Sequence, residues 1–269
     1  MDDRRRSSGH LMLITPERVL YAGLLGRPRG RMSGGFNIYV SIEGGLSFVS
    51  DGWTQTNADL IVVPPEVRHT ITSDHRAVIV YVIEPESVAR GVLDALLLRC
   101  EGPERAALAR RIRAAHAHLH KTCGGQIATT ACLDKLCLGE TLPSRALDPR
   151  VARAIARMDA FGSGEPVTAD VCAAGAGLST SRFLHLFKEE TGIAFRALRA
   201  WKRARHLLHY VNEDVNFARL AQDIGYPDST HFSHSIRRYY GLKPRAIFSG
   251  SRDLAIYRTS QDGGLAISA

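Results

Sequence analysis

The chain of 269 residues has no long hydrophobic run. A membrane-spanning helix needs about 18 or more predominantly apolar residues in a row, and no run approaches that length. The apolar run Leu11–Ile14, which follows the basic cluster Arg4–Arg6, is too short for a secretory signal. These absences predict a cytoplasmic protein without a membrane partner.

Cysteine is scarce, and no Cys-x-x-Cys pair occurs. The five cysteines are Cys100, Cys123, Cys132, Cys137 and Cys172. An odd number at this low density does not suit a disulfide scaffold. Cys132 and Cys137 stand five residues apart, which favours ordinary buried thiols over a zinc or redox site.

Negative charge is in the minority, and the formal net charge is +8. Residues 146–250 hold 15 Lys and Arg against 10 Asp and Glu, whereas residues 1–145 hold 18 against 15. Positive charge is therefore denser toward the C-terminus, which permits binding of a polyanion. Hydrophobic residues make up 45% of the chain, enough for a packed core in about two domains.

Residues 11–85 have the pattern of a β-rich domain. Short runs of β-branched and aromatic residues are separated by Gly-Gly, Asp-Gly, Pro-Pro and Asp-His pairs. The runs are Asn37–Ile42, Leu46–Ser50, Leu60–Val63 and Ala77–Ile83. Several short strands in succession predict a sandwich or small barrel, which we place at residues 1–86.

Beyond Glu86, apolar residues recur at helical spacing. They are Val88, Val92 and Leu96, then Leu108, Ile112, Ala115 and Leu119. Two or three helices are expected between residues 87 and 140, docked on the β-domain or pairing two protomers, and we assign 87–145 to a helical linker or dimerisation region. The stretch Leu142–Arg150 is typical of a boundary at which Asp148-Pro149 opens a helix.

One pattern of twelve residues occurs twice, at Ser181–Gly192 and Thr230–Gly241. Both copies have Phe at the third place, His at the fifth, an apolar residue at the seventh, a basic residue at the eighth and Gly at the end. Gly177 and Gly225 each follow a short helical pattern before a copy. A short helix, a Gly-containing turn and a second helix indicate two helix-turn-helix motifs.

A helix is expected between the two copies, at Phe195–Val211. Its apolar stripe includes Trp201 and is flanked by basic residues that form a solvated face or lie near a polyanion. The basic residues are Arg199, Lys202, Arg203 and Arg205. Two helix-turn-helix units on one rigid connecting helix can read two adjacent major grooves as a monomer, because grooves on one DNA face recur about every 34 Å.

Residues 150–248 resemble the double helix-turn-helix domain of AraC/XylS-type transcription regulators. The resemblance is carried by Gly177–Gly192 and Leu220–Phe248, including the Gly-Leu-Lys-Pro close at Gly241–Pro244. It implies an α+β fold: an N-terminal cupin-like β-barrel with following helices, an all-α DNA-binding domain at 146–250, and a tail at 251–269.

In each copy the repeated Phe and the apolar residue four places later should be buried, so the residues between them face outward. The candidate DNA contacts are Ser181, Arg182, Leu184, His185 and Lys188, then Ser229, Thr230, His231, Ser233, His234, Arg237 and Arg238. Hydroxyls and imidazoles can reach base edges or phosphates, whereas Arg and Lys here suit phosphates. The alternative for the two repeated histidines is a surface or capping role.

Ala58–Thr72 is similar to the second cupin motif, with Asp59, Pro64 and His69 in place and Ala58 and Glu66 where glycines are expected. The first cupin motif should supply two His and a Glu, but no His occurs in residues 33–55. One His does not make a metal site, so no metal or other cofactor is predicted. A metal-dependent cupin enzyme remains an alternative reading.

The Arg-rich stretch Arg27–Arg31, followed by Ser41 and Gly44, resembles the cyclic di-GMP signature of PilZ-type receptors. Closely spaced guanidinium groups can grip a phosphate from two sides. The candidate effector residues are Arg27, Arg29, Arg31, Ser41, Gly44 and His69. The alternative is a solvated loop that binds nothing.

These observations predict a sequence-specific transcription regulator, an activator rather than an enzyme. The expected partners are promoter DNA, a small effector with cyclic di-GMP as the leading candidate, RNA polymerase and a second copy of the chain. A constitutive DNA binder without effector is the further alternative.

Overall fold

The computed structural model describes residues 9–27, 29–122, 129–160, 167–259 and 265–268. Strands from the N-terminal part, with two from the end of the chain, form a seven-stranded sheet in the order β10-β9-β1-β2-β8-β3-β6, and a three-stranded sheet has the order β5-β4-β7. The strands are β1 (Leu11–Ile14), β2 (Arg18–Leu24), β3 (Phe36–Ser41), β4 (Leu46–Ser50), β5 (Trp53–Ala58), β6 (Leu60–Val63), β7 (His69–Ser73), β8 (Ala77–Ile83), β9 (Ala255–Thr259) and β10 (Leu265–Ser268).

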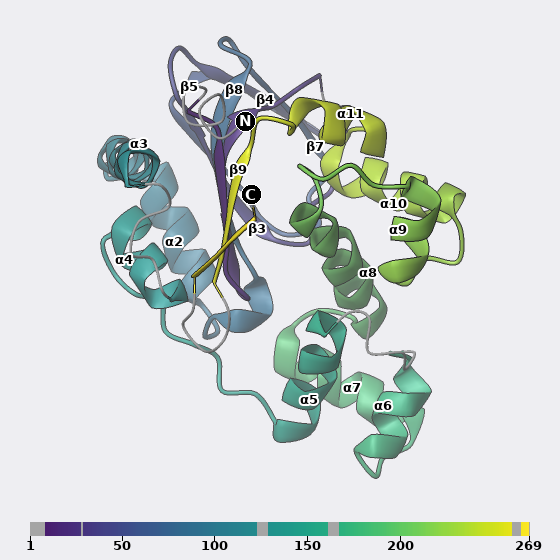
Figure 1. The fold of residues 1–269 in the computed structure, drawn as a ribbon. Coiled ribbons are helices and arrows are strands. Elements are labelled where there is room, and N and C mark those ends of the chain that lie inside the picture. The colour runs from purple at the N-terminus through teal and green to yellow at the C-terminus, as the bar shows by residue number, and fades with distance from the viewer. Residues whose placement is uncertain (1–8, 28, 123–128, 161–166, 260–264, 269) are drawn as a thin grey trace.

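The large sheet separates two helical groups (Figure 1). One group covers one face, and the other extends from the opposite side of the sheet. The first group is α2 (Val92–Glu101), α3 (Arg105–Lys121) and α4 (Thr130–Leu138), which follow the turn η1 (Pro85–Ser87). The second is α5 (Pro149–Asp159), α6 (Ala169–Gly175), α7 (Thr180–Thr191), α8 (Phe195–His206), η2 (Leu207–His209), α9 (Phe217–Asp223), α10 (Ser229–Tyr240) and α11 (Pro244–Gly250). The predicted α+β fold, with a β-domain, following helices and a C-terminal helical domain, is confirmed.

Strand β1 shows why the sheet is buried on both faces. All four of its residues are buried, and successive side chains of a strand point to opposite faces. Leu11 and Leu13 join the core beneath α2–α4, whereas Met12 and Ile14 join the core of the C-terminal helices. The same short apolar run therefore holds both helical groups to one sheet.

The predicted tail contains a strand of the N-terminal sheet. Strand β9 pairs in parallel with β1, with Leu11 opposite Ala255 and Ile14 opposite Arg258. Ile256 and Tyr257 are buried in this position. The sequence analysis assigned no strand here, because five residues of mixed polarity near the end of the chain carry a weak signal.

The expectation of buried thiols is confirmed at three described cysteines and is wrong for Cys132. Cys100, Cys137 and Cys172 are buried and free, and Cys132 is free and exposed. Cys123 lies outside the described residues. No helix within the described ranges is both long and apolar enough to cross a membrane.

Candidate nucleic-acid interface and interdomain cavity

The two copies of the repeat form equivalent helices. Helix α7 is capped by Ser179, whose hydroxyl accepts from the Arg182 amide, and α10 by Asp228, whose carboxylate accepts from the Thr230 and His231 amides. Each helix ends at a left-handed glycine, Gly192 or Gly241. The repeated final Gly is therefore a helix stop, needed twice for the same reason.

The repeated aromatic and apolar positions form the domain core. Phe183 and Phe187 of α7 are fully buried, as are Phe232 and Ile236 of α10. Phe195, the first residue of α8, packs its ring at 5.7 Å from Phe183 and 5.2 Å from Phe187 between ring centroids. The second helix of each helix-turn-helix motif, α7 or α10, thus turns one apolar face toward the interior and its opposite face toward solvent.

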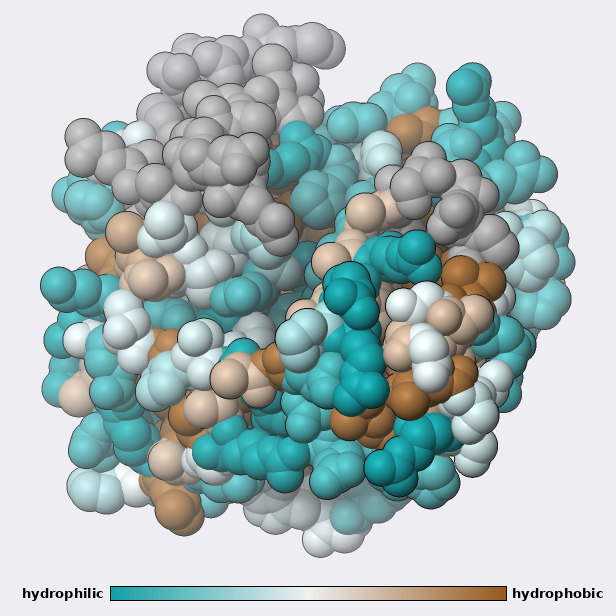
Figure 2. Space-filling view, turned by 90° about the horizontal axis from the view of Figure 1, so that it is seen from below, coloured by the Kyte–Doolittle hydropathy of each residue, from teal (hydrophilic) through white to brown (hydrophobic). Residues whose placement is uncertain are grey.

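The candidate DNA contacts lie on those outer faces. In α7 all five are exposed, and in α10 all are exposed except Ser233, which is half-buried. Leu184 is the one large hydrophobic residue among them and is 38% exposed. Figure 2 shows the end of the molecule seen from below: hydrophilic side chains cover much of it, with hydrophobic ones between them.

His231 and His234 differ in their surroundings. The Nδ1 atom of His231 lies 2.8 Å from an Asp228 carboxylate oxygen, so this ring joins the cap of α10. Hydrogen bonds from His231 lower the pKa of Asp228. His234, one turn further along, is exposed. His231, which the sequence analysis placed among the DNA contacts, therefore has a capping role, whereas the repeated histidines His185 and His234 are exposed on the helix surface.

Helix α8 connects the two motifs and is shorter than expected. It ends at His206, because Leu207–His209 continue as a 3-10 turn. Twelve residues at 1.5 Å each span about 18 Å, compared with the roughly 25 Å expected for Phe195–Val211.

The basic residues of α8 are in part buried in the protein. Lys202 is 3% exposed, and its ammonium lies 2.7 Å from Glu86, 3.1 Å from Asp159 and 3.7 Å from Glu84. Burial alone would lower the pKa of Lys202, but the three carboxylates raise it. Arg205, 6% exposed, lies 2.8 Å from Glu84 and donates to the Thr15 carbonyl at 2.6 Å. These two residues bind the sheet domain instead of forming a solvated face.

Trp201 completes this junction. Its indole Nε1 donates to Glu84 at 2.9 Å. Its ring packs on Gly34, where an added Cβ would come within 2.4 Å of the Trp201 Cγ. The connecting helix thus docks on the sheet domain through a tight apolar contact beside a buried ionic cluster.

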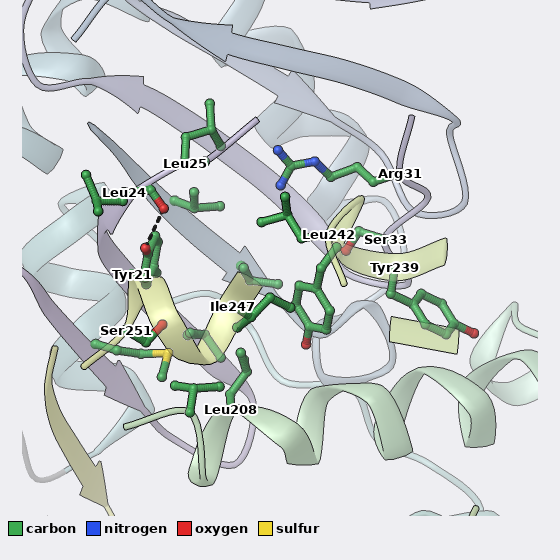
Figure 3. Close-up of a pocket in the computed structure, with 18 of the residues that line it drawn as sticks. Tyr21, Leu24, Leu25, Arg31, Ser33, Leu208, Tyr239, Leu242, Ile247 and Ser251 are labelled. Atoms are coloured by element: carbon green, nitrogen blue, oxygen red, sulfur yellow. Dashed lines mark hydrogen bonds between the residues drawn. The ribbon is translucent and has the colours of Figure 1, made fainter. Parts of the chain in front are cut away.

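A cavity of about 210 Å³ lies at the same junction. Strands β2, β3 and β8 form one wall, and α8, α10 and α11 form the other, with mostly apolar side chains between them (Figure 3). The hydroxyl of Tyr21 in this wall is turned to the Leu24 carbonyl, to which it donates at 2.7 Å.

Arg31 is the charged group of this cavity that lacks a partner. Its side chain reaches over Leu242 toward Leu25 at one end of the pocket (Figure 3). It is 9% exposed, and its Nε and one terminal nitrogen have no hydrogen-bond partner among the described residues. The guanidinium also lies 5.8 Å from the Tyr39 ring centroid. A buried guanidinium with unused donors in an apolar cavity is chemically able to bind an anion.

The other candidate effector residues do not converge on one point. Arg27 and Arg29 are exposed, and Pro28 between them lies outside the described residues. Ser41 is buried and accepts from Arg113, and Gly44 is in the turn after β3.

His69, by contrast, contacts Arg31 through an isolated β-bridge. Its ring bonds to Tyr39 and to the Val67 carbonyl. Burial lowers its pKa to about 4. No three His, Cys, Asp or Glu side chains in the described part of the chain form a group suited to a metal ion.

The functional residues that the sequence analysis missed are those of the junction. Glu84 and Glu86 follow β8 in the predicted β-domain boundary, more than 100 residues before α8. Only the folded chain brings them to Lys202 and Arg205. An acidic pair after a buried strand, opposite an unexplained basic run, is the signal that could have indicated an internal ionic contact.

Comparisons with known proteins agree with this geometry. Residues 172–249 match the family described as a helix-turn-helix domain. An apo variant of ToxT from Vibrio cholerae is 13% identical, covering 87% of this chain and 97% of ToxT with a TM-score of 0.50, which shows a shared fold. Wild-type ToxT with an unsaturated fatty acid bound is 10% identical to this chain. The match covers 87% of this chain and 95% of ToxT, with a TM-score of 0.49.

A transcriptional regulator from Chromobacterium violaceum, described as an AraC-type DNA-binding domain-containing protein, is 22% identical. The matched region covers 39% of this chain and 92% of the regulator's chain, with a TM-score of 0.35. No curated protein matches the chain significantly.

Proposed function

Given that residues 172–249 form an AraC-type helix-turn-helix domain, we propose that this chain is a sequence-specific DNA-binding transcription regulator controlled by a small effector. The observation that carries the proposal is the pair of equivalent helices α7 and α10, each with a buried apolar face and an exposed polar one. The DNA contacts are the candidate residues on those exposed faces. When the chain binds DNA, the N-terminal half of α7 and the N-terminal half of α10 enter successive major grooves.

Selection of duplexes from a random pool by the full chain tests this function. His185→Ala or His234→Ala should reduce affinity for the selected sequence about tenfold, as expected for loss of a base contact worth about 1–3 kcal/mol, and should affect random DNA less. His75→Ala, an exposed histidine in the turn before β8, is the matched control. Equal effects on selected and random DNA would contradict base contact by these histidines.

The effector that the cavity suits is a compact apolar molecule with one anionic group. Its volume of about 210 Å³ exceeds the roughly 150 Å³ of an apolar cavity that holds benzene. The lining suits an aromatic ring or acyl chain, and Arg31 suits a carboxylate. Cyclic di-GMP finds no support, since Arg27 and Arg29 are exposed and do not line the cavity, and its two phosphates and guanines are too polar for this wall.

Calorimetry with decanoate, benzoate, decanol and cyclic di-GMP tests the effector class. Wild type and Arg27→Ala should bind the carboxylate equally, and Arg31→Ala should bind it at least about tenfold more weakly, because the anion loses its buried partner. Decanol should not distinguish the three proteins. Unchanged carboxylate binding by Arg31→Ala contradicts the proposal, and no binding of any probe favours a constitutive regulator.

The remaining parts of the proposal concern assembly. We place the regulator in the cytoplasm as a dimer that activates transcription with RNA polymerase. The helices of residues 87–145 supply the pairing surface, with Leu98 of α2 71% exposed. Light scattering of wild type and Leu98→Glu tests the pairing, and a fully monomeric wild type would exclude it. A metal-dependent enzyme is the second reading, and stoichiometric metal in the purified protein would revive it.

A further inference from the structure

Helix α7 is held at its C-terminal end by residues outside the DNA-binding domain. The last carbonyls of a helix have no partner within the helix. The Glu189 carbonyl accepts from the Arg90 side chain, and the Glu190 carbonyl accepts from Arg145 at 2.7 Å. Both arginines belong to the region at 87–145. Two cations at a helix C-terminus also suit its dipole.

Arg145 is itself fixed to the segment that follows β8. Its Nε donates to the Val88 carbonyl at 2.9 Å, and its backbone amide donates to the Ser87 carbonyl at 3.1 Å. Val88 and Ser144 form an isolated β-bridge beside it. The position of Arg145 therefore follows the segment directly after β8.

Helix α10 is held in the same way from another segment. The Arg238 carbonyl accepts from the Met32 amide at 2.8 Å, and the Gly241 carbonyl accepts from the Arg29 amide at 3.1 Å. Met32 and Arg29 lie in the loop between β2 and β3. We call α7 and α10 the recognition helices. Each is thus held at its C-terminal end, and each leaves its N-terminal half free to enter a DNA groove.

The attachment at α10 borders the interdomain cavity, and the attachment at α7 is connected to it along the chain through β8. Arg31 and Ser33, on either side of Met32, line it, and so do Val80 and Val82 of β8. From β8 the chain continues through Glu84 and Glu86, which hold α8, to Arg90. A change in the cavity is therefore connected by a few residues to both recognition helices.

We propose that the sheet domain sets the distance and angle between the two recognition helices, and that Arg90 and Arg145 are positioning residues for the spacing of the two DNA half-sites. The inference rests on the proposed DNA-binding function. The clamp at α7 acts on a helix terminus without touching DNA. Its loss leaves the base-reading side chains in place but relaxes the separation at which they are presented.

The test compares duplexes that differ in spacing. The full chain selects its preferred duplex, and affinities are then measured for this duplex and for versions with one base pair inserted or removed between the half-sites. Wild type should discriminate strongly against the altered spacings, because one base pair changes both separation and rotation. In Arg90→Ala/Arg145→Ala the affinity for the preferred duplex, divided by the affinity for a duplex of altered spacing, should fall by about fivefold or more. A factor of about five is the lower end of the coupling measured between two sites of one protein.

Three further variants sharpen the result. Arg99→Ala is the control, because Arg99 pairs with Glu104 and Glu140 away from α7. Arg90→Lys/Arg145→Lys keeps the charge and should restore part of the discrimination. The single variant Arg90→Ala, which removes an exposed contact, serves if the double variant does not fold.

The outcomes separate the two claims. Selective binding by wild type with an unchanged spacing ratio in the arginine variants overturns the positioning role alone. Uniformly weaker binding at every spacing also overturns it, since that is the effect of general destabilisation. Absence of selective binding by the wild type overturns the proposed function, and the positioning role with it.

Discussion

A single missing side chain allows the sheet domain and the connecting helix to pack against each other. At Gly34 an added Cβ would lie 2.4 Å from the Trp201 Cγ, which no real contact permits. We predict that Gly34→Ala displaces the indole from Glu84 and lowers the free energy of unfolding by about 1–3 kcal/mol, as overpacking does. Urea unfolding monitored by tryptophan fluorescence measures it.

The matched control for this substitution is Gly175→Ala. At Gly175 in α6 the nearest atom to an added Cβ is the end of Arg157 at 3.9 Å. This variant should be neutral or slightly stabilising, because Ala is favoured over Gly in a helix. Equal destabilisation by both substitutions would show that the Trp201 contact is not the cause.

One buried and two half-buried histidines give the protein a predictable sensitivity to acid. Burial lowers the pKa of His69 and of His206 to about 4 and that of His209 to about 3. An unfolded His titrates near 6.5, so between these values the unfolded chain binds more protons than the folded one. The free energy of unfolding should therefore decrease as the pH falls from about 7 toward 4.

Thermal unfolding between pH 7 and pH 5 measures this dependence. His69→Gln, which removes one titrating group, should have a shallower decrease in Tm than the wild type. His185→Gln makes the same substitution at an exposed position and is the control. A slope that is the same in all three proteins would remove His69 from the explanation.

Helix α8 depends on ionic contacts that reach across the junction. Lys202→Ala would leave Glu86 buried without its cation and Glu84 with Arg205 as its remaining cation, and breaking a buried pair in this way costs about 3–5 kcal/mol. Arg196→Ala, at an exposed position on the same helix, should change stability by less than about 0.5 kcal/mol. Chemical unfolding of both variants tests the difference, and equal values would place the stabilisation elsewhere.

The elements differ in how far local sequence determines them. Leu46–Ser50, Leu60–Val63 and Ala77–Ile83 were predicted with the observed bounds, because β-branched runs between turn residues specify strands locally. The outward faces of α7 and α10 were predicted because Phe and apolar residues recur at helical spacing. Each of these patterns is contained in a stretch of about a dozen residues or fewer.

Contacts between segments that are far apart in the sequence have no local sequence pattern, so they were not predicted. The cavity has walls from both parts of the chain, and the cluster at Lys202 depends on Glu84 and Glu86 far earlier. One local clue did survive: Glu66, where the cupin motif has glycine, adopts a φ of 62°. A left-handed backbone favours glycine, and at this position a glutamate adopts it.

Across the whole molecule, strand β9 connects the last part of the chain to the first. A chain that stops at Leu254 would lose Ile256 and Tyr257 from the core, each worth about 1.5–3 kcal/mol, and would leave β1 as an edge. We predict a lower urea midpoint and faster amide exchange at Leu11–Ile14. A chain that stops at Thr259 keeps β9 and is the control, and identical exchange in both would contradict the role of the strand.

The parallel pairing of β1 with β9 also has a consequence for biosynthesis. On the ribosome β1 emerges early, whereas β9 follows the whole DNA-binding domain. Throughout translation the nascent sheet therefore carries an unpaired backbone edge that other chains can join. Strand β1 therefore cannot pair with β9 until residues 149–250 have been made.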